Sequence, residues 1–332
     1  MREPAFWWRK AGLASRLLAP AGLIYGGIAA RRMAMSGVDA GVPVLCVGNF
    51  TLGGAGKTPT AIMLARMLVD AGERPFCLSR GYGGDVVGPR RVNAHADIAA
   101  QVGDEALLLA HAAPTVVARD RLAGAKFARE QGAGIIVMDD GLQNSSLTKH
   151  FTLTVIDARR GVGNRYVFPA GPLRAPLAAQ LAQTDALLVV GEGTGADEVI
   201  AQVRMRGLPV FHSRMIPDPA AVAAIKGRNV LAFAGIGDPE KFFATALEAG
   251  IAVTERREFP DHYRYTAEDA GELIMQAEHN GLALLTIEKD RARITGEPAL
   301  AALATRAHAL PVTMMVEEAG SLRQLIMSKL RR

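Results

Sequence analysis

The chain has 332 residues, of which 49% are hydrophobic and 21% are charged. This length and composition exclude a disordered chain and predict one large domain or two. The two cysteines are too few for a disulfide scaffold or a cysteine-rich zinc site. The low cysteine content therefore favours the reducing cytosol as the compartment. The net charge is +5, and residues 1–40 alone hold six Lys and Arg residues against two Asp and Glu residues. Most nucleic-acid-binding proteins spread their excess positive charge over one face of the fold, whereas this chain concentrates it in one segment. We therefore expect no nucleic-acid partner.

The first 36 residues are basic and apolar. Their longest uncharged run, residues 17–30, has 14 residues, whereas a helix needs about 20 to span a bilayer. Two tryptophans at positions 7 and 8 precede two basic residues, and aromatic rings beside cations are typical of a helix in the headgroup region of an anionic membrane. We therefore expect residues 1–36 to form an amphipathic, membrane-associated helix. The alternative is a helix packed on the protein's own core.

From residue 42 onward, apolar runs of strand length alternate with helical patterns. The expected strands are 42–47, 75–79, 115–118, 135–138, 151–156, 186–190, 208–211 and 229–234, with helices at 59–70, 104–111 and 121–131 among them. Apolar strands separated by helices indicate an α/β fold with a parallel sheet covered by helices on both faces.

Residues 212–226 contain two prolines and interrupt this rhythm, so we place a domain boundary near residue 216. The expected strands near 252–256 and 283–286 and the helices beginning near 239 and 266 resume the alternation. They predict a smaller α/β domain over residues 217–332, beside a first domain over residues 37–216. The last helix could return to the first domain.

The strand at 42–47 runs into the loop GNFTLGGAGKT, residues 48–58, and then into a helix. This order is what a Walker A phosphate loop of the P-loop NTPase fold requires, because backbone N–H groups and a helix N-terminus converge on phosphate oxygens. Lys57 would reach the β- and γ-phosphates, and the Thr58 hydroxyl would hold Mg²⁺. The predicted nucleotide-binding residues are Thr51, Gly53, Gly54, Ala55, Gly56, Lys57 and Thr58, with Thr51 in place of the first glycine of the usual pattern.

The apolar strand at 135–138 ends in Asp139 and Asp140. In P-loop proteins such a strand lies beside the strand of the phosphate loop and brings a carboxylate to Mg²⁺. We therefore expect Asp139 to be a metal ligand together with Thr58, and both aspartates to belong to the catalytic site. An ordinary Asp-Gly turn is the alternative. Because the sequence contains no Asn-Lys-x-Asp motif for guanine, ATP is the favoured nucleotide.

Several segments resemble, in one order, the motifs of the tetraacyldisaccharide 4′-kinase (lipid A 4′-kinase) family. They are VGNFTLGGAGKTP (47–59), SRGYGG (79–84), VGDEALLLA (102–110), VMDDGLQN (137–144), FPAGPLRAPL (168–177), AGIGDPEKFF (234–243), FPDHYRYT (259–266) and TIEKDRAR (286–293). The resemblance implies transfer of the ATP γ-phosphate to the 4′-hydroxyl of tetraacyl lipid A disaccharide 1-phosphate at the cytoplasmic face of the inner membrane, by a peripheral or monotopic enzyme. Asn144 and Ala175 depart from the family pattern, which often has His and Glu there.

The resemblance also implies that Asp104 of the VGDE motif is the catalytic base and His262 of the DHY motif its partner. The alternatives are an Asp104 that only caps a helix and a His262 in an ordinary turn. Because His262 lies beyond residue 216, its catalytic role predicts that the second domain closes over the first. Lys289 and Asp290 could approach the nucleotide or only begin a helix.

Cations at strand ends predict binding of the acceptor's 1-phosphate, because the guanidinium group matches phosphate oxygens. The predicted acceptor-binding residues are Arg80, Arg119, Arg121, Asn144 and Arg174, and solvated surface side chains are the alternative for each arginine. A membrane-associated P-loop ATPase that acts as a nucleotide switch is the alternative function. The sequence indicates no obligate protein partner.

Overall fold

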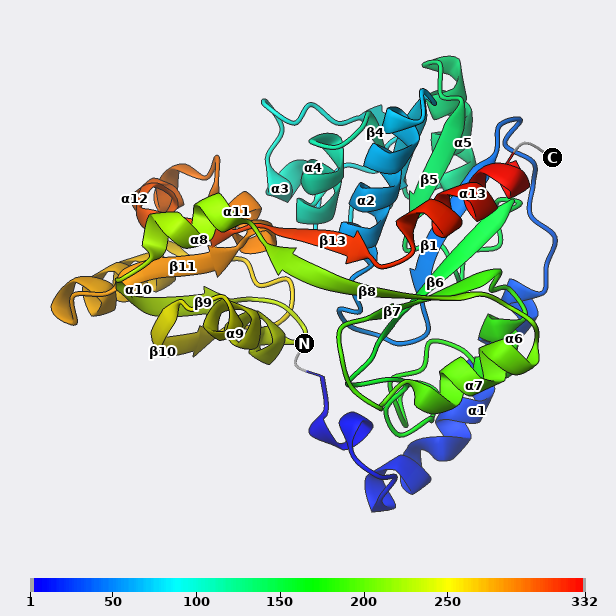
Figure 1. The fold of residues 1–332 in the computed structure, drawn as a ribbon, viewed down its shortest axis with the longest axis horizontal. Coiled ribbons are helices and arrows are strands. Elements are labelled where there is room, and N and C mark those ends of the chain that lie inside the picture. Colours follow the sequence, from blue (N-terminus) through cyan, green and yellow to red (C-terminus); the bar gives the residue numbers. More distant parts are fainter. Residues whose placement is uncertain (1–2, 331–332) are drawn as a thin grey trace.

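The computed structural model describes residues 3–330. Figure 1 shows two sheets side by side, which we call the nine-stranded unit and the four-stranded unit, with the N-terminal helix on the surface of the larger one. This arrangement confirms the predicted fold class, a mostly parallel α/β sheet with a second, smaller α/β sheet. The domain boundaries near residues 36 and 216 stay predictions.

The nine-stranded sheet has the strand order β13-β8-β7-β6-β1-β5-β2-β4-β3. Its strands are β1 Val44–Asn49, β2 Pro75–Ser79, β3 Arg90–Arg91, β4 Thr115–Val117, β5 Ile135–Asp139, β6 Phe151–Asp157, β7 Ala186–Val190, β8 Val210–Pro217 and β13 Val312–Val316. The seven inner strands are parallel, and the edge strands β3 and β13 pair antiparallel with their neighbours. The first sheet therefore takes its last strand from the far end of the chain.

Helices cover both faces of this sheet, because successive residues of a strand point to opposite faces. In β1, Leu45 and Val47 pack into the core under α2 and α13, while Val44 and Cys46 face the core under α5. The helices are α2 Lys57–Asp70, α3 Ala99–Val102, α4 Asp104–Ala110, α5 Arg121–Glu130, α6 Leu177–Leu181, α7 Asp197–Met205 and α13 Ala319–Leu330. Helix α2 begins at Lys57, two residues before the expected start, because the phosphate loop turns directly into it.

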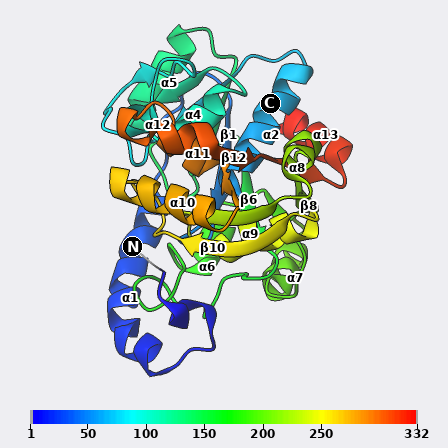
Figure 2. The same cartoon turned by 90° about the vertical axis from the view of Figure 1, so that its left-hand side faces the viewer.

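The four-stranded sheet is parallel throughout, in the order β10-β9-β11-β12. Its strands are β9 Asn229–Ala234, β10 Ala252–Glu258, β11 Ala283–Ile287 and β12 Ala307–Leu310, and its helical elements are α8 Pro219–Ile225, α9 Pro239–Glu248, α10 Ala267–His279, α11 Glu288–Ile294, η2 Pro298–Leu300 and α12 Ala301–Arg306. Figure 2, seen from the side of this unit, shows α10 and α9 beside β10. The chain then returns through β13 to the larger sheet.

The N-terminal segment forms a short 3-10 helix, η1 Ala5–Trp8, and then α1 Leu13–Met33. Gly22 and Gly26 are buried against the 167–176 region, where a β-carbon on Gly22 would lie 2.8 Å from the Val167 carbonyl oxygen. Large apolar side chains, including Leu17 and Ile24, point outward. The helix thus packs through small residues and exposes its apolar ones, which differs from the expected separation of polar and apolar faces.

Helix α1 is also longer than its uncharged run. It has 21 residues and is long and apolar enough to cross a membrane by length and composition. The argument from 14 uncharged residues underestimated it, because Arg16, Arg31 and Arg32 lie within the helix near its ends rather than outside it. Cations near helix ends reach the interface along their aliphatic stems.

Candidate active site

The phosphate loop joins the end of β1 to the start of α2, as the sequence predicts. Gly53 and Gly56 have φ values of 95° and 96°, in the left-handed region that favours glycine. Thr51 has no positive φ; it forms an isolated bridge with Leu173, so the position that departs from the usual pattern does not need a glycine. Asn49, which the sequence analysis missed, donates from Nδ2 to the Thr51 carbonyl oxygen at 2.8 Å and so fixes the loop.

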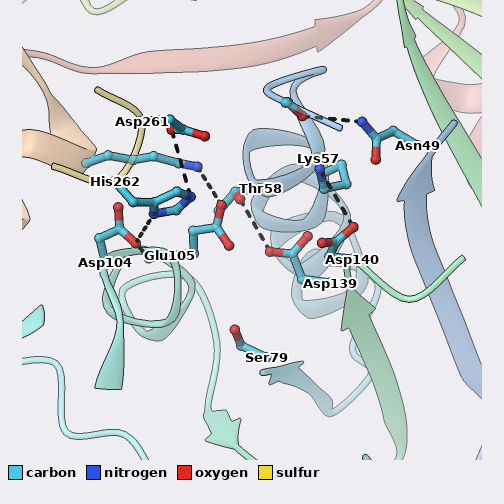
Figure 3. Close-up of polar contacts among 12 residues, drawn as sticks. Asn49, Lys57, Thr58, Ser79, Asp104, Glu105, Asp139, Asp140, Asp261 and His262 are labelled. Carbon is cyan, nitrogen blue, oxygen red and sulfur yellow. Dashed lines mark hydrogen bonds and ion pairs between the residues drawn. The ribbon is translucent and has the colours of Figure 1, made fainter. Parts of the chain in front are cut away.

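The two aspartates lie next to this loop, because β5 pairs with β1 and places Asp139 beside Val47. Thr58 Oγ1 donates to Asp139 Oδ2 at 3.3 Å. Asp139 Oδ1 is buried and accepts no hydrogen bond from the described residues. Figure 3 shows Lys57 and Thr58 pointing toward the aspartate pair. The sequence therefore predicted this cluster correctly as a set of neighbours.

The two carboxyl groups differ in their electrostatics. Burial, together with the nearby carboxyl groups of Glu105 and Asp140, raises the pKa of Asp139 to about 7. Burial also disfavours ionised Asp140, but Arg174 and Lys57 outweigh it and lower the pKa of Asp140. Arg174 Nη1 lies 2.7 Å from Asp140 Oδ1, and Lys57 Nζ lies 3.7 Å from the same oxygen. Asp140 is thus the charged partner of the cations, while a cation bound beside Asp139 would favour its ionised form.

Asp104 and His262 come together across the two units. The His262 Nδ1 atom lies 3.8 Å from Asp104 Oδ1 at the start of α4. His262 has a left-handed backbone with φ 55°, and its ring lies edge to face with Tyr82 at 4.5 Å. Arg293 Nε donates to Asp104 Oδ2 at 2.8 Å. The carboxylate is therefore held by a residue of α11 in addition to its own helix.

Glu105 and Lys289 form a second ion pair between the units, and the sequence analysis did not predict this contact. Lys289 Nζ lies 2.6 Å from Glu105 Oε1. Burial disfavours ionised Glu105, but Lys289 and Lys57 outweigh it and lower its pKa to about 2. Lys289 lies in the first turn of α11 and lines the cavity, and its approach to the nucleotide stays a prediction. A 184-residue separation hides such a pair from sequence reasoning.

The predicted acceptor-binding arginines fall into two groups. Arg80 and Arg119 line the cavity. Arg121 and Arg174 also line it but are bonded to the aspartate pair, Arg121 through the Asp139 carbonyl oxygen at 3.1 Å. Asn144 lines the cavity with its Oδ1 atom accepting hydrogen bonds from the Ser146 backbone and hydroxyl.

These side chains face one cavity of about 1630 Å³ between the units. It is larger than the roughly 300–1,000 Å³ of most small-molecule sites, so it can hold two ligands. Its lining includes the phosphate loop, both aspartates, Glu105, His262 and Lys289, and it extends to the N-terminal residues Glu3, Pro4, Phe6 and Trp7. Asp104, only 3% exposed, and Thr51 are not part of the lining.

Known proteins similar to the chain extend over its whole length. A tetraacyldisaccharide 4′-kinase of Rhodopseudomonas palustris (strain BisB5) is 54% identical, with 99% of this chain and 97% of the relative aligned. The enzyme of the same name from Nitrobacter winogradskyi is 51% identical, with 100% and 99% aligned. The crystal structure of LpxK from Aquifex aeolicus in complex with ATP superimposes with a TM-score of 0.72 at 27% identity, covering 96% of this chain and 100% of that one. The family described as tetraacyldisaccharide-1-P 4′-kinase matches residues 14–331, and the chain belongs to this family.

Proposed function

We propose that this protein transfers the γ-phosphate of ATP to the 4′-hydroxyl of tetraacyl lipid A disaccharide 1-phosphate and so produces the 1,4′-bisphosphate. The family match over residues 14–331 is the observation that carries this proposal. The ATP complex of the related Aquifex protein supports the choice of nucleotide. The cavity supports it as well, because a phosphate loop, paired carboxylates and arginines line one space large enough for a nucleotide and a sugar.

The phosphate loop would bind the triphosphate. Its glycines expose backbone N–H groups, and α2 directs its positive end to the same place. Lys57, the first residue of α2, would neutralise the β- and γ-phosphates. Asp140, itself paired with Arg174, lies 3.7 Å from the Lys57 ammonium group and attracts it to this side of the loop before ATP arrives.

Thr58 and Asp139 would hold Mg²⁺. The free, buried Oδ1 atom of Asp139 and the adjacent Thr58 hydroxyl suit a hard cation that prefers oxygen ligands. Among residues 3–330 there is no group of three or more His, Cys, Asp or Glu side chains suited to a metal, which favours an ion shared with phosphate oxygens over a protein-only site. Bound there, Mg²⁺ would neutralise charge on the transferring phosphate.

The pair Asp104 and His262 would accept the proton of the attacking hydroxyl. His262 lines the cavity, and Asp104 lies 3.8 Å behind it, so the carboxylate can orient the imidazole. Because the two residues come from different units, this assignment requires the units to stay together during the transfer, with Asp104 and His262 as close as they lie here. Arg80 and Arg119, which line the cavity, are the arginines that we assign to the acceptor's 1-phosphate. Arg121 and Arg174 are bonded to the aspartate pair and would support the nucleotide end of the site.

Helix α1 would bring the enzyme to its substrate. An acceptor with four acyl chains stays in the bilayer, because each buried CH₂ group contributes about 0.8 kcal/mol. The exposed apolar side chains of α1, with cations at both ends of the helix, suit the anionic cytoplasmic surface of the inner membrane. We propose this surface as the enzyme's location and partner.

Transfer from [γ-³²P]ATP to tetraacyl-disaccharide 1-phosphate in detergent micelles tests the function. The unaltered protein should label the lipid, and Lys57→Met and Asp104→Asn should each lower turnover by at least 100-fold. Lys126→Met, on the exposed side of α5, is the matched control and should leave turnover unchanged.

Absence of labelled lipid with the unaltered protein, while ATP is still bound and slowly hydrolysed, would contradict the kinase and favour the nucleotide switch. A kinase consumes ATP in proportion to added acceptor, whereas a switch hydrolyses it without acceptor.

A further inference from the structure

The N-terminal segment reaches the phosphate loop through Glu3. This residue precedes η1 and lines the same cavity as Lys57. A β-carbon added to Gly53 would lie 2.0 Å from Glu3 Oε1, and one added to Gly237 of the four-stranded unit would lie 2.9 Å from it. The carboxyl group therefore lies where the phosphate loop, the second unit and the N-terminal segment meet.

One oxygen of this carboxyl group is firmly held. Glu3 Oε2 accepts a hydrogen bond from Arg160 Nη1 at 3.0 Å and another from Trp8 Nε1 at 2.9 Å. Arg160 also stacks over the Trp8 ring, 4.7 Å from its centre, and pairs with Asp238 at 2.7 Å. The side chain of Glu3, only 12% exposed, is thus fixed in one orientation.

The other oxygen has no partner. Glu3 Oε1 is buried and accepts no hydrogen bond from residues 3–330. Burial raises the pKa of Glu3, opposed by Arg160 and Trp8. A buried acceptor atom without a donor costs free energy, so an oxygen packed against the phosphate loop in a residue that lines the cavity would gain from a donor that a ligand brings beside it.

The two ligands of the proposed reaction differ in what they offer this oxygen. The triphosphate of ATP presents only acceptor oxygens and negative charge near Gly53, which a carboxylate repels. The acceptor sugar presents hydroxyl groups, which donate hydrogen bonds to carboxylates. The chemistry of the free oxygen, which lies beside the phosphate loop, therefore matches a sugar hydroxyl and not the triphosphate.

We propose that Glu3 is an acceptor-binding residue whose Oε1 atom receives a hydrogen bond from a sugar hydroxyl of the acceptor beside the phosphate loop. This inference rests on the proposed kinase function. It also gives the N-terminal segment a second role, because the same short stretch of chain leads directly into α1. The acceptor would thus be bound from one side by residues continuous with its membrane helix.

Steady-state kinetics of Glu3→Gln tests the role. The amide oxygen of the variant can keep the hydrogen bonds from Arg160 and Trp8, so its NH₂ group replaces the free oxygen and the charge-assisted hydrogen bond from the sugar hydroxyl is lost. We expect the KM for tetraacyl-disaccharide 1-phosphate to rise about 10- to 100-fold, with the KM for ATP within about twofold of the unaltered protein. Glu3→Asp, which keeps the charge but withdraws the oxygen, should also raise the KM for the acceptor.

Glu198→Gln is the matched control, since Glu198 is half exposed, pairs with Arg165 and does not line the cavity. It should change neither KM. An unchanged KM for the acceptor in Glu3→Gln would overturn the inference. A lower KM for ATP would also overturn it, because Glu3 would then obstruct the nucleotide. A higher Mg²⁺ requirement would overturn it as well, because Glu3 would then be a metal ligand. Turnover by the unaltered protein in the same assay separates these results from failure of the kinase function itself.

Discussion

Arg174 and Arg119 both line the cavity, but they have different surroundings. Arg174 donates from Nη1 to Asp140 and from Nε to the Thr51 carbonyl oxygen at 2.9 Å, so it supports the phosphate loop and its aspartate together. No ion pair of Arg119 is found among residues 3–330, and only its backbone N–H is bonded, to the Val87 carbonyl oxygen. The first arginine is thus part of the nucleotide end of the site, and the second is free to bind a ligand.

Replacing each arginine by methionine should separate these roles. Arg174→Met removes the strongest cation beside Asp140, so the pKa of Asp140 should rise and kcat should fall about 10- to 100-fold through loss of a charge-assisted bond. Arg119→Met should instead raise the KM for the acceptor and leave kcat within about twofold. Kinetics with each substrate varied in turn distinguish them, and equal effects of both variants on the acceptor KM would contradict the division.

Sequence reasoning found the residues of this site that a short motif fixes. Lys57, Thr58 and Asp139 follow from a loop between strand and helix and from an apolar strand that ends in carboxylates. It missed Glu3 and Glu105, because their partners Arg160 and Lys289 lie 157 and 184 residues away. Such contacts depend on how the two units and the N-terminal segment meet, which no local pattern encodes.

Helix α1 is buried against the protein at Ser15, Gly22, Gly26 and Met33. Gly22 meets the Val167 carbonyl oxygen, whereas Gly27 has nothing within 4 Å of its added β-carbon. Both glycines lie inside the helix, where alanine is favoured over glycine by about 1 kcal/mol. The same substitution should therefore have opposite effects at the two positions.

Gly27→Ala should raise the midpoint of thermal unfolding in detergent, because it improves helix propensity without a new contact. Gly22→Ala should lower it, because the helix must move away from backbone at Val167, and overpacking costs about 1–3 kcal/mol. Differential scanning calorimetry of the two variants measures this. A shift of the same sign in both would mean that α1 does not pack on the 167–176 region in solution.

The outward face of α1 predicts membrane binding that does not depend on stability. Leu17 and Ile24 are 71% and 70% exposed, so Leu17→Glu with Ile24→Glu should leave the unfolding midpoint unchanged. The double variant should bind anionic vesicles at least 100-fold more weakly, since each buried side chain of this kind contributes about 1.5–3 kcal/mol. Met205→Glu, which lies in α7 and is 80% exposed, is the control in a vesicle sedimentation assay. Equal binding by all three proteins would contradict a membrane role for α1.

At the scale of the molecule, the sequence predicted the order of elements better than their assembly. The alternation of strands and helices gave both sheets because it reflects burial on two faces. The alternation did not predict the second half of β8, because this strand extends to Pro217 only by pairing with β13, almost 100 residues later in the chain. The ion pairs between the units, such as Asp157 with Lys241 and Asp238 with Arg160, could not be predicted from a local sequence pattern either.

The ion pair between Asp157 and Lys241, which joins the two units, should make the stability of the fold depend on pH. Lys241 Nζ lies 2.7 Å from Asp157 Oδ2, and the Asp157 side chain is only 8% exposed. Burial disfavours ionised Asp157, but Lys241 and two backbone N–H groups outweigh it and lower its pKa below the usual value near 3.8. A carboxyl group with a lowered pKa in the folded state stabilises the fold above its unfolded pKa, and this contribution disappears as the pH falls through the lowered value.

Asp157→Asn should therefore lower the free energy of unfolding at pH 7 by about 1–3 kcal/mol, the range for hydrogen bonds to charged groups. The difference from the unaltered protein should shrink below pH 4 and vanish once Asp157 is protonated in both states. Denaturant titration followed by tryptophan fluorescence at several pH values measures it, with Asp85→Asn as the control, because Asp85 is 81% exposed and pairs with Arg264 at 3.7 Å. A difference that stays constant from pH 7 to pH 3 would show that the variant acts through packing and not through the ion pair, since packing does not titrate in this range.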